Sequence, residues 1–140
     1  MSTPAVTRSR LSQSTLDSLM TAMKGEAFAY VKYMLFAEHA RNNGRPDIAA
    51  AFERAAKTER FEHFAEEAQL AGLVGTDGEN LLDALAGESY EIETMYKEFA
   101  QLAFEAGDRE AAERFEEVRQ DEIEHRDLFR AALEKLPRAG

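Results

Sequence analysis

Cysteine is absent from this chain, and so are long apolar runs. A chain without cysteine forms no disulfide, no thiolate metal site and no iron–sulfur cluster, and it has no cysteine nucleophile. Its apolar runs fall far short of the roughly 20 residues that a membrane-spanning helix needs. The first residues, MSTPAVTRSRLSQS, lack the apolar core of a signal peptide. We therefore expect a cytoplasmic protein with no membrane segment.

Basic residues are also fewer than acidic ones. The 140 residues include 17 Lys and Arg against 27 Asp and Glu, which leaves a formal net charge of −10. Nucleic acid and anionic membrane surfaces repel such a chain, so neither is expected as its main partner. Hydrophobic residues still make up 44% of the sequence, which is enough for one domain to bury a core.

Proline and glycine are sparse, and their positions divide the chain into helices. Between the breaks at 42–47, 72–78 and 105–110, apolar residues recur every three or four positions, as in amphipathic helices. The sequence therefore predicts an all-α four-helix bundle with no strand. The predicted helices cover residues 12–42, 46–71, 79–106 and 108–135. They form one domain over 12–136, between a flexible segment 1–11 and a tail 137–140.

The two halves of the chain resemble each other. A constant offset of 63 relates the pairs Tyr33/Tyr96, Phe36/Phe99, Gly44/Gly107, Phe52/Phe115 and Glu59/Glu122. The pair Glu26/Glu88 instead matches at an offset of 62, so the third helix carries one extra residue between Glu88 and Tyr96. A single inserted residue is commonly absorbed as a π-bulge. We predict such a bulge near 91–95.

Carboxylates lie on the apolar stripe of every predicted helix, where a bundle normally places Leu or Ala. The stripes carry Glu26, then Glu59 and Glu62, then Glu88 and Glu91, and finally Glu122 with His125. A buried, unpaired carboxylate costs several kcal/mol, and no Lys or Arg lies on these stripes. Either the carboxylates are protonated or a polycation lies among them. Oxygen ligands with imidazole suit Fe, Mn or Zn.

The spacing of these residues is close to that of di-metal carboxylate bundles. Those bundles use one Glu from each of two helices and a Glu-x-x-His pair from each of the other two. The fourth helix supplies Glu122 and His125 at this spacing, whereas the second supplies Glu59 and Glu62, with His63 one residue later.

With these residues, the sequence resembles the rubrerythrins of the ferritin-like superfamily. The resemblance covers roughly residues 16–135 and rests on GEAFAYVKYMLFA, AGESYEIETMYKEFAQLA and EVRQDEIEHRDLF. It implies a ferritin-like bundle with a non-haem di-iron centre, in which Mn or Zn could substitute for the two iron ions. By position, the implied ligands are Glu26, Glu59, Glu88, Glu91, Glu122 and His125. Tyr33 and Tyr96 match family tyrosines beside the centre, although an aromatic residue at helical spacing can also be ordinary core.

Two departures from the family pattern affect the expected chemistry. The family has a His where Glu62 stands, and an anionic oxygen there should favour the ferric state. We expect Glu62 to be the ligand, with His63 taking its place only if the helix shifts locally. Many family members also carry a cysteine-ligated rubredoxin-like module. Because this chain has no cysteine, its electrons are expected from an external donor protein, rubredoxin-like or a flavoprotein.

The break between the second and third helices is short for a ferritin-like bundle. Helices of about 25 residues are roughly 37 Å long, whereas about seven extended residues reach at most about 25 Å. Exchange of helix pairs between two chains would solve this, so we expect a domain-swapped homodimer. A monomeric bundle is the alternative.

The expected function is a di-iron peroxidase that reduces hydrogen peroxide. Two alternatives stay open. The centre could oxidise Fe(II) as a ferroxidase, or the metal could only hold the helices together.

Overall fold

The structure is a computed structural model that describes residues 10–137, and these residues form helices with no strand among them. The all-α prediction is therefore confirmed. The expectations for residues 1–9 and 138–140 lie outside the described part of the chain. The helices are α1 (Gln13–Asn42), α2 (Pro46–Thr58), η2 (Glu59–Phe64), α3 (Ala65–Ala71), α4 (Asp77–Tyr90), η3 (Glu91–Met95), α5 (Tyr96–Glu105) and α6 (Arg109–Lys135).

Three of these segments, α2, η2 and α3, follow one another without a break, and so do α4, η3 and α5. The segments η2 and η3 are π-helical turns within longer α-helices. The described residues thus form four long helices at the predicted places.

Local sequence signals fix the helix ends. The third long helix begins at Asp77, two residues before the predicted start at 79, because Thr76 and Glu79 form a capping box. The first and third long helices are each followed by a glycine with positive φ, Gly44 at 69° and Gly107 at 86°. A left-handed glycine there lets the chain turn back directly into the next helix.

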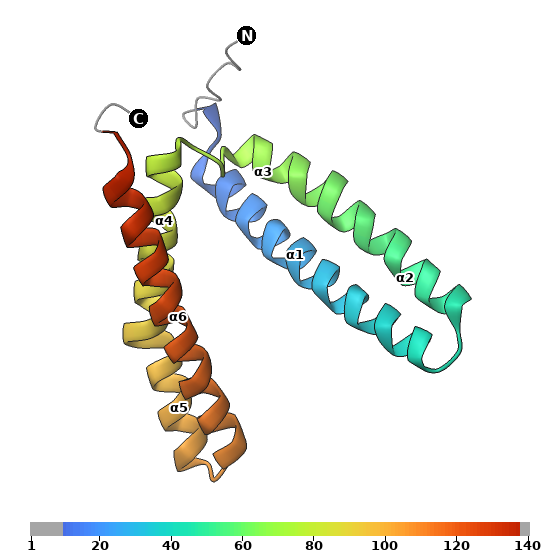
Figure 1. The fold of residues 1–140 in the computed structure, drawn as a ribbon. Helices are drawn as coiled ribbons and strands as arrows, with labels where there is room; N and C mark the ends of the chain where they lie inside the picture. Colours follow the sequence, from blue (N-terminus) through green and yellow to red (C-terminus); the bar gives the residue numbers. More distant parts are fainter. Residues whose placement is uncertain (1–9, 138–140) are drawn as a thin grey trace. The chain divides into compact units, whose positions relative to one another are not determined.

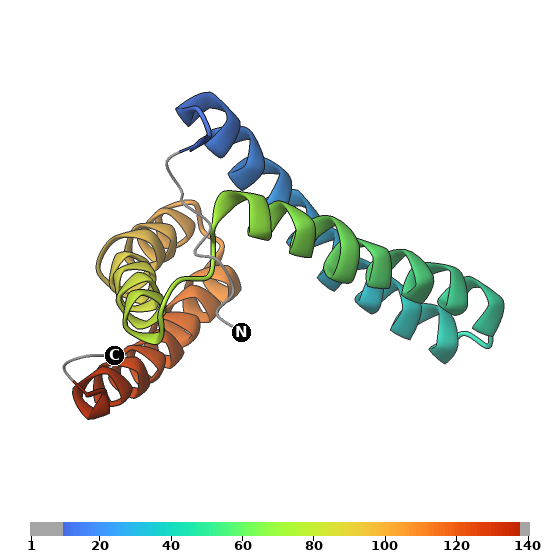
Figure 2. The same ribbon diagram turned by 90° about the horizontal axis from the view of Figure 1, so that it is seen from above.

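The chain divides into two compact units, residues 1–74 and 75–140. In the first unit α1 lies along α2, η2 and α3, and in the second unit α6 lies along α4, η3 and α5 (Figure 1). The view from above shows the same pairing of helices within each unit (Figure 2). Each unit is therefore a helical hairpin.

Small residues line the contact between the two helices of a hairpin. In the first unit Ala37, Ala40 and Ala49 form a buried cluster against which Phe52 packs. Among the described residues, no large side chain is fully buried. Large apolar side chains such as Phe28 and Leu102, which are 69% and 61% exposed, lie on the hairpin surfaces. A hairpin by itself therefore buries only a thin core.

The aromatic residues confirm the internal repeat predicted from the sequence. In the first unit Tyr33, Phe36 and Phe52 form a cluster with ring centroids 5.3 to 6.4 Å apart. In the second unit the residues at an offset of 63 form the same cluster, with centroids 5.7 to 6.2 Å apart. The two hairpins are thus built on one plan.

The π turn predicted near 91–95 is confirmed, because η3 spans Glu91–Met95. The second π turn, η2, was not predicted. It begins at the ligand candidate Glu59 and lies in the second long helix. Each hairpin therefore carries one π turn, although the two turns lie in non-equivalent helices.

Among the described residues, no helix combines the length and the apolar character needed to cross a bilayer.

Candidate metal centre

The first unit brings together two carboxylates and an imidazole. Glu26 comes from the middle of α1, and Glu59 and His63 come from η2. The Nδ1 atom of His63 lies 3.4 Å from Oε2 of Glu26 and 3.6 Å from Oε2 of Glu59. One potential ligand atom from each of the three residues lies within 4.8 Å of the other two, a spacing that could hold a metal ion.

The structure brings His63 to this group and leaves Glu62 outside it. Glu62 is exposed, and it is not among the three clustered residues. The physical reason is η2, because a π turn adds one residue and changes which side chain reaches the face that Glu59 occupies. The local shift needed for the His63 alternative is therefore present.

The sequence contains a signal for η2 as well. Glu59 matches Glu122 at an offset of 63, whereas His63 matches His125 at an offset of 62. One extra residue between Glu59 and His63 accounts for the difference. The signal has the same form as the one that predicted η3.

The second unit forms an equivalent group from Glu88, Glu122 and His125. Glu88 lies in α4, and the other two lie one turn apart on α6. The Nδ1 atom of His125 is 3.3 Å from Oε2 of Glu122. Because α6 is regular here, the i+3 spacing alone places both side chains on one face.

Burial and neighbouring negative charge raise the pKa of Glu88 to about 7. Desolvation is the largest cause, followed by the hydrogen bond and the charge of Glu122 and by the charge of Glu91, while His125 acts in the opposite direction. In the absence of a cation, this group holds more negative charge than its surroundings favour.

Glu91, the first residue of η3, belongs electrostatically to the same cluster. Burial, and then the charge of Glu122, raise the pKa of its carboxyl group. Glu91 has no acidic counterpart in the first unit, where offsets of 62 and 63 lead to Ala29 and Phe28. The π turn therefore adds a carboxylate that the other hairpin lacks.

One buried oxygen in each group lacks a hydrogen-bond partner. These atoms are Oε2 of Glu26 and Oε2 of Glu88, which occupy equivalent positions in the two hairpins. A buried acceptor is normally satisfied, because leaving it without a partner costs about 1–3 kcal/mol. Carboxylate oxygens beside an imidazole are suitable ligands for Fe, Mn or Zn, so the residues fit a metal ion.

Each of the two tyrosines lies in the aromatic cluster of its hairpin, and Tyr96 also interacts with the carboxylates of the second group. Desolvation raises the pKa of Tyr96, and the charges of Glu91, Glu122 and Glu88 raise it further. Tyr96 therefore keeps its phenol proton at neutral pH, within the electrostatic field of the second group. Tyr33 occupies the equivalent place in the first unit, packed against Phe36 and Phe52.

Two arginines of α6 contact η3, and neither is among the predicted site residues. Arg119 donates from Nε to the backbone carbonyl oxygen of Ile92 at 2.7 Å, and Arg126 donates from Nη1 to Glu93 at 3.3 Å. Arg119 precedes Glu122 by three residues and Arg126 follows it by four. This spacing, which places both on the helix face of Glu122, is the sequence signal that predicts them.

Comparison with known proteins identifies the family. The sequence matches the Rubrerythrin family over residues 17–63 and 57–133. It is 35% identical to rubrerythrin from Porphyromonas gingivalis, over 85% of this chain and 66% of that protein. It is 33% identical to nigerythrin from Nitratidesulfovibrio vulgaris, over 88% of this chain and 67% of that protein.

A third relative, symerythrin from Cyanophora paradoxa, is 33% identical over 74% of this chain and 73% of that protein. The chain spans about two thirds of the length of the first two relatives. With matches that together cover most of the described residues, the chain belongs to the rubrerythrin family.

Proposed function

We propose that this protein is a non-haem di-iron peroxidase that reduces hydrogen peroxide with electrons from an external donor protein. The observation that carries the proposal is the pair of equivalent Glu–Glu–His groups, one in each hairpin, each with a buried Glu oxygen that lacks a hydrogen-bond partner. Membership of the rubrerythrin family supports iron as the metal.

In this proposal the two groups supply the ligands of two iron ions. Glu26, Glu59 and His63 are the donors of the first hairpin. The donors of the second hairpin are Glu88, Glu122 and His125. Glu91 is the additional carboxylate of the second hairpin, and Glu62 is not needed as a ligand.

The bound irons would supply two-electron redox chemistry toward peroxide. The reaction H₂O₂ + 2e⁻ + 2H⁺ → 2H₂O breaks one O–O bond, and the donor protein provides both electrons. Tyr96 retains its proton beside three carboxylates, so its hydroxyl group can donate a hydrogen bond toward an oxygen atom in the site. Tyr33 is proposed to play the same part from the first hairpin.

Each hairpin carries only part of the ligand set, so we include assembly in the proposal. A first and a second hairpin come together to complete one di-iron site, and in a domain-swapped homodimer they come from different chains. The exposed apolar side chains and thin core of a single hairpin support the need for such pairing.

Metal analysis and rapid kinetics test the activity. The wild-type protein should bind two irons per complete site, and the reduced protein should be oxidised faster by H₂O₂ than by O₂. Repeated turnover of added Fe(II) with O₂, without preference for peroxide, would instead establish a ferroxidase. A protein that binds metal but carries out neither reaction would leave a structural role for the metal.

A further inference from the structure

The π turn η3 changes the hydrogen bonding of its own backbone. The N–H group of Tyr96 bonds to the carbonyl oxygen of Glu91, five residues earlier. In an α-helix the same N–H group would bond to the carbonyl oxygen of Ile92. The π turn therefore takes from Ile92 its usual backbone donor, in a residue that is only 3% exposed.

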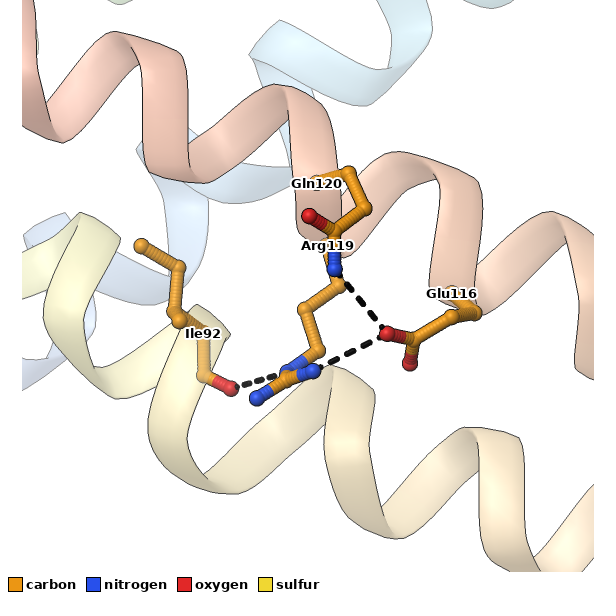
Figure 3. Close-up of polar contacts among 4 residues, drawn as sticks. All are labelled: Ile92, Glu116, Arg119 and Gln120. Carbon is orange, nitrogen blue, oxygen red and sulfur yellow. Dashed lines mark hydrogen bonds and ion pairs between the residues drawn. The ribbon is translucent and has the colours of Figure 1, made fainter.

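Arg119 donates to that carbonyl oxygen from the opposite helix. Its Nε atom lies 2.7 Å from the oxygen of Ile92, and its side chain is 25% exposed (Figure 3). A buried carbonyl without a donor is costly, and a charged donor gives one of the stronger hydrogen bonds. In a regular helix the N–H group of Tyr96 would bond to the carbonyl oxygen of Ile92, and Arg119 would not be needed there. The contact with Arg119 therefore stabilises the π turn relative to a regular helix.

Neighbours on α6 hold the guanidinium group in position. Its Nη1 atom donates to Glu116 at 2.9 Å, and Gln120 donates to the same carboxylate oxygen at 3.1 Å (Figure 3). Because the guanidinium is a rigid planar fork, a contact at Nη1 also orients Nε.

The same face of α6 carries the candidate ligand Glu122. Arg119 precedes Glu122 by three residues and Arg126 follows it by four, so all three lie along one face. Arg126 contacts the side chain of Glu93, the residue after Ile92 in the turn, at 3.3 Å. The two arginines that flank Glu122 along α6 thus both contact η3.

The first hairpin has no equivalent of Arg119. An offset of 63 leads to Ala56, which is fully buried. The arginine therefore accompanies the hairpin whose π turn carries the extra carboxylate, Glu91.

We propose that Arg119 is a positioning residue, an inference that rests on the proposed function. Arg119 holds η3 as a π turn, so that Glu91 faces Glu122 as a metal ligand. It touches neither metal nor substrate and acts through the backbone of Ile92.

The test compares Arg119→Gln with Arg114→Gln. Arg114 forms an exposed i,i+3 ion pair with Glu117 on the same helix, so it is a matched control without a contact to η3. Amide hydrogen exchange of residues 92–97 in the metal-free protein measures the turn, and titration with Co(II), followed by its visible absorption bands, measures ligand placement.

For Arg119→Gln we expect at least about tenfold faster exchange at Tyr96 and Lys97. Co(II) should bind roughly 10–100-fold more weakly with altered visible bands, as is typical when a residue that orients a ligand is lost. Arg114→Gln should match the wild type in both measurements. An Arg119→Gln protein that also matches would overturn the inference, as would faster exchange with unchanged Co(II) binding and bands.

Arg119→Lys keeps the positive charge and guards against a Gln variant that fails to fold. It should fold and still show the faster exchange and weaker binding, because it lacks the fork that contacts Glu116 and Ile92 together. Wild-type values for Arg119→Lys would mean that charge alone suffices and would overturn the inference. A wild-type protein that binds no metal would instead overturn the proposed function, while hydrogen exchange would still test whether Arg119 holds the turn.

Discussion

At the scale of single residues, the chemistry of the proposed metal centre depends most on whether Glu62 or His63 is the ligand. Glu62 and His63 are neighbours in sequence, yet only His63 reaches Glu26 and Glu59. With His63 as the ligand, each Glu–Glu–His group has two carboxylates and one neutral imidazole. The shift toward the ferric state that a carboxylate from Glu62 would cause is then not expected.

Substitution of the two neighbours separates these assignments. His63→Gln should weaken metal binding at the first group by more than about 100-fold, since the effect should exceed the roughly 10–100-fold loss typical of residues behind the ligands. Glu62→Gln should leave affinity within a few-fold of the wild type. Titration with Fe(II) under anaerobic conditions measures both, and the opposite ranking would restore Glu62 as the ligand.

The carboxyl group of Glu88 predicts a pH dependence for the metal-free protein. Its pKa rises from 4.5 to about 7 in the folded state. The fold therefore favours the protonated form, so this contribution to stability is complete below about pH 4.5 and is lost as the pH rises through about 7.

Urea unfolding at several pH values measures this effect. Between pH 5 and pH 8 the free energy of unfolding of the metal-free wild type should fall relative to that of Glu88→Gln, which cannot ionise. Metal affinity should change in the opposite sense, strengthening as the pH rises toward 7, because protons then compete less for the ligand. A constant difference between the two proteins across this range would refute the assigned pKa.

At the scale of secondary-structure elements, each of the two π turns accommodates one extra residue, and the two turns lie in different helices. In an α-helix each residue turns the chain by about 100°, so one extra residue rotates everything after it away from its face. A π turn absorbs the extra residue. Thus η3 keeps Glu88 and Tyr96 in register with their counterparts, and η2 keeps the rest of its helix against α1.

Deletion of one residue from η2 tests this account. Removing Phe61, which is 62% exposed, would turn Glu59-Arg-Phe-Glu-His63 into the Glu-x-Glu-His spacing found at Glu122 and His125. We expect a regular α-helix that still binds metal with the wild-type stoichiometry.

The control is deletion of Ala51, an exposed residue in the regular part of α2. It should rotate Glu59 and His63 away from Glu26 and abolish binding at the first group. Circular dichroism checks that both proteins fold, and metal analysis compares them. Equal loss of metal in the two deletions would argue against η2 as a one-residue insertion.

At the scale of the whole molecule, the proposed function assigns half of the metal ligands to each hairpin, and each hairpin has only a thin core. A domain-swapped dimer combines the first hairpin of one chain with the second hairpin of its partner. Two defective chains can then complement each other. Glu26→Ala damages only the first hairpin and Glu122→Ala only the second, so a mixed dimer contains one intact site and one doubly damaged site.

Co-refolding of these two variants provides the measurement. Random pairing makes half of the dimers mixed, so about a quarter of the wild-type number of intact sites should return. Each variant refolded alone serves as the control and should contain none. If metal binding is not recovered in a mixture that does form dimers, the site is completed within one chain.

The sequence by itself determined the features that depend on local periodicity and composition. It located the four helices, the repeat of the aromatic clusters, the carboxylates on the apolar stripes and the π turn η3, because each leaves a count of residues that can be read along one chain. The early start at Asp77 could also be read locally, from the capping box of Thr76 and Glu79.

Only the tertiary structure decided which side chains meet. A shift of one residue in a helix exchanges Glu62 for His63, and the packing of η2 against α1 then brings His63 to Glu26. Similarly, the contact of Arg119 with the carbonyl oxygen of Ile92 joins residues 27 positions apart. Periodicity gives the face on which a residue lies, whereas the partner it meets depends on the packing of a second helix.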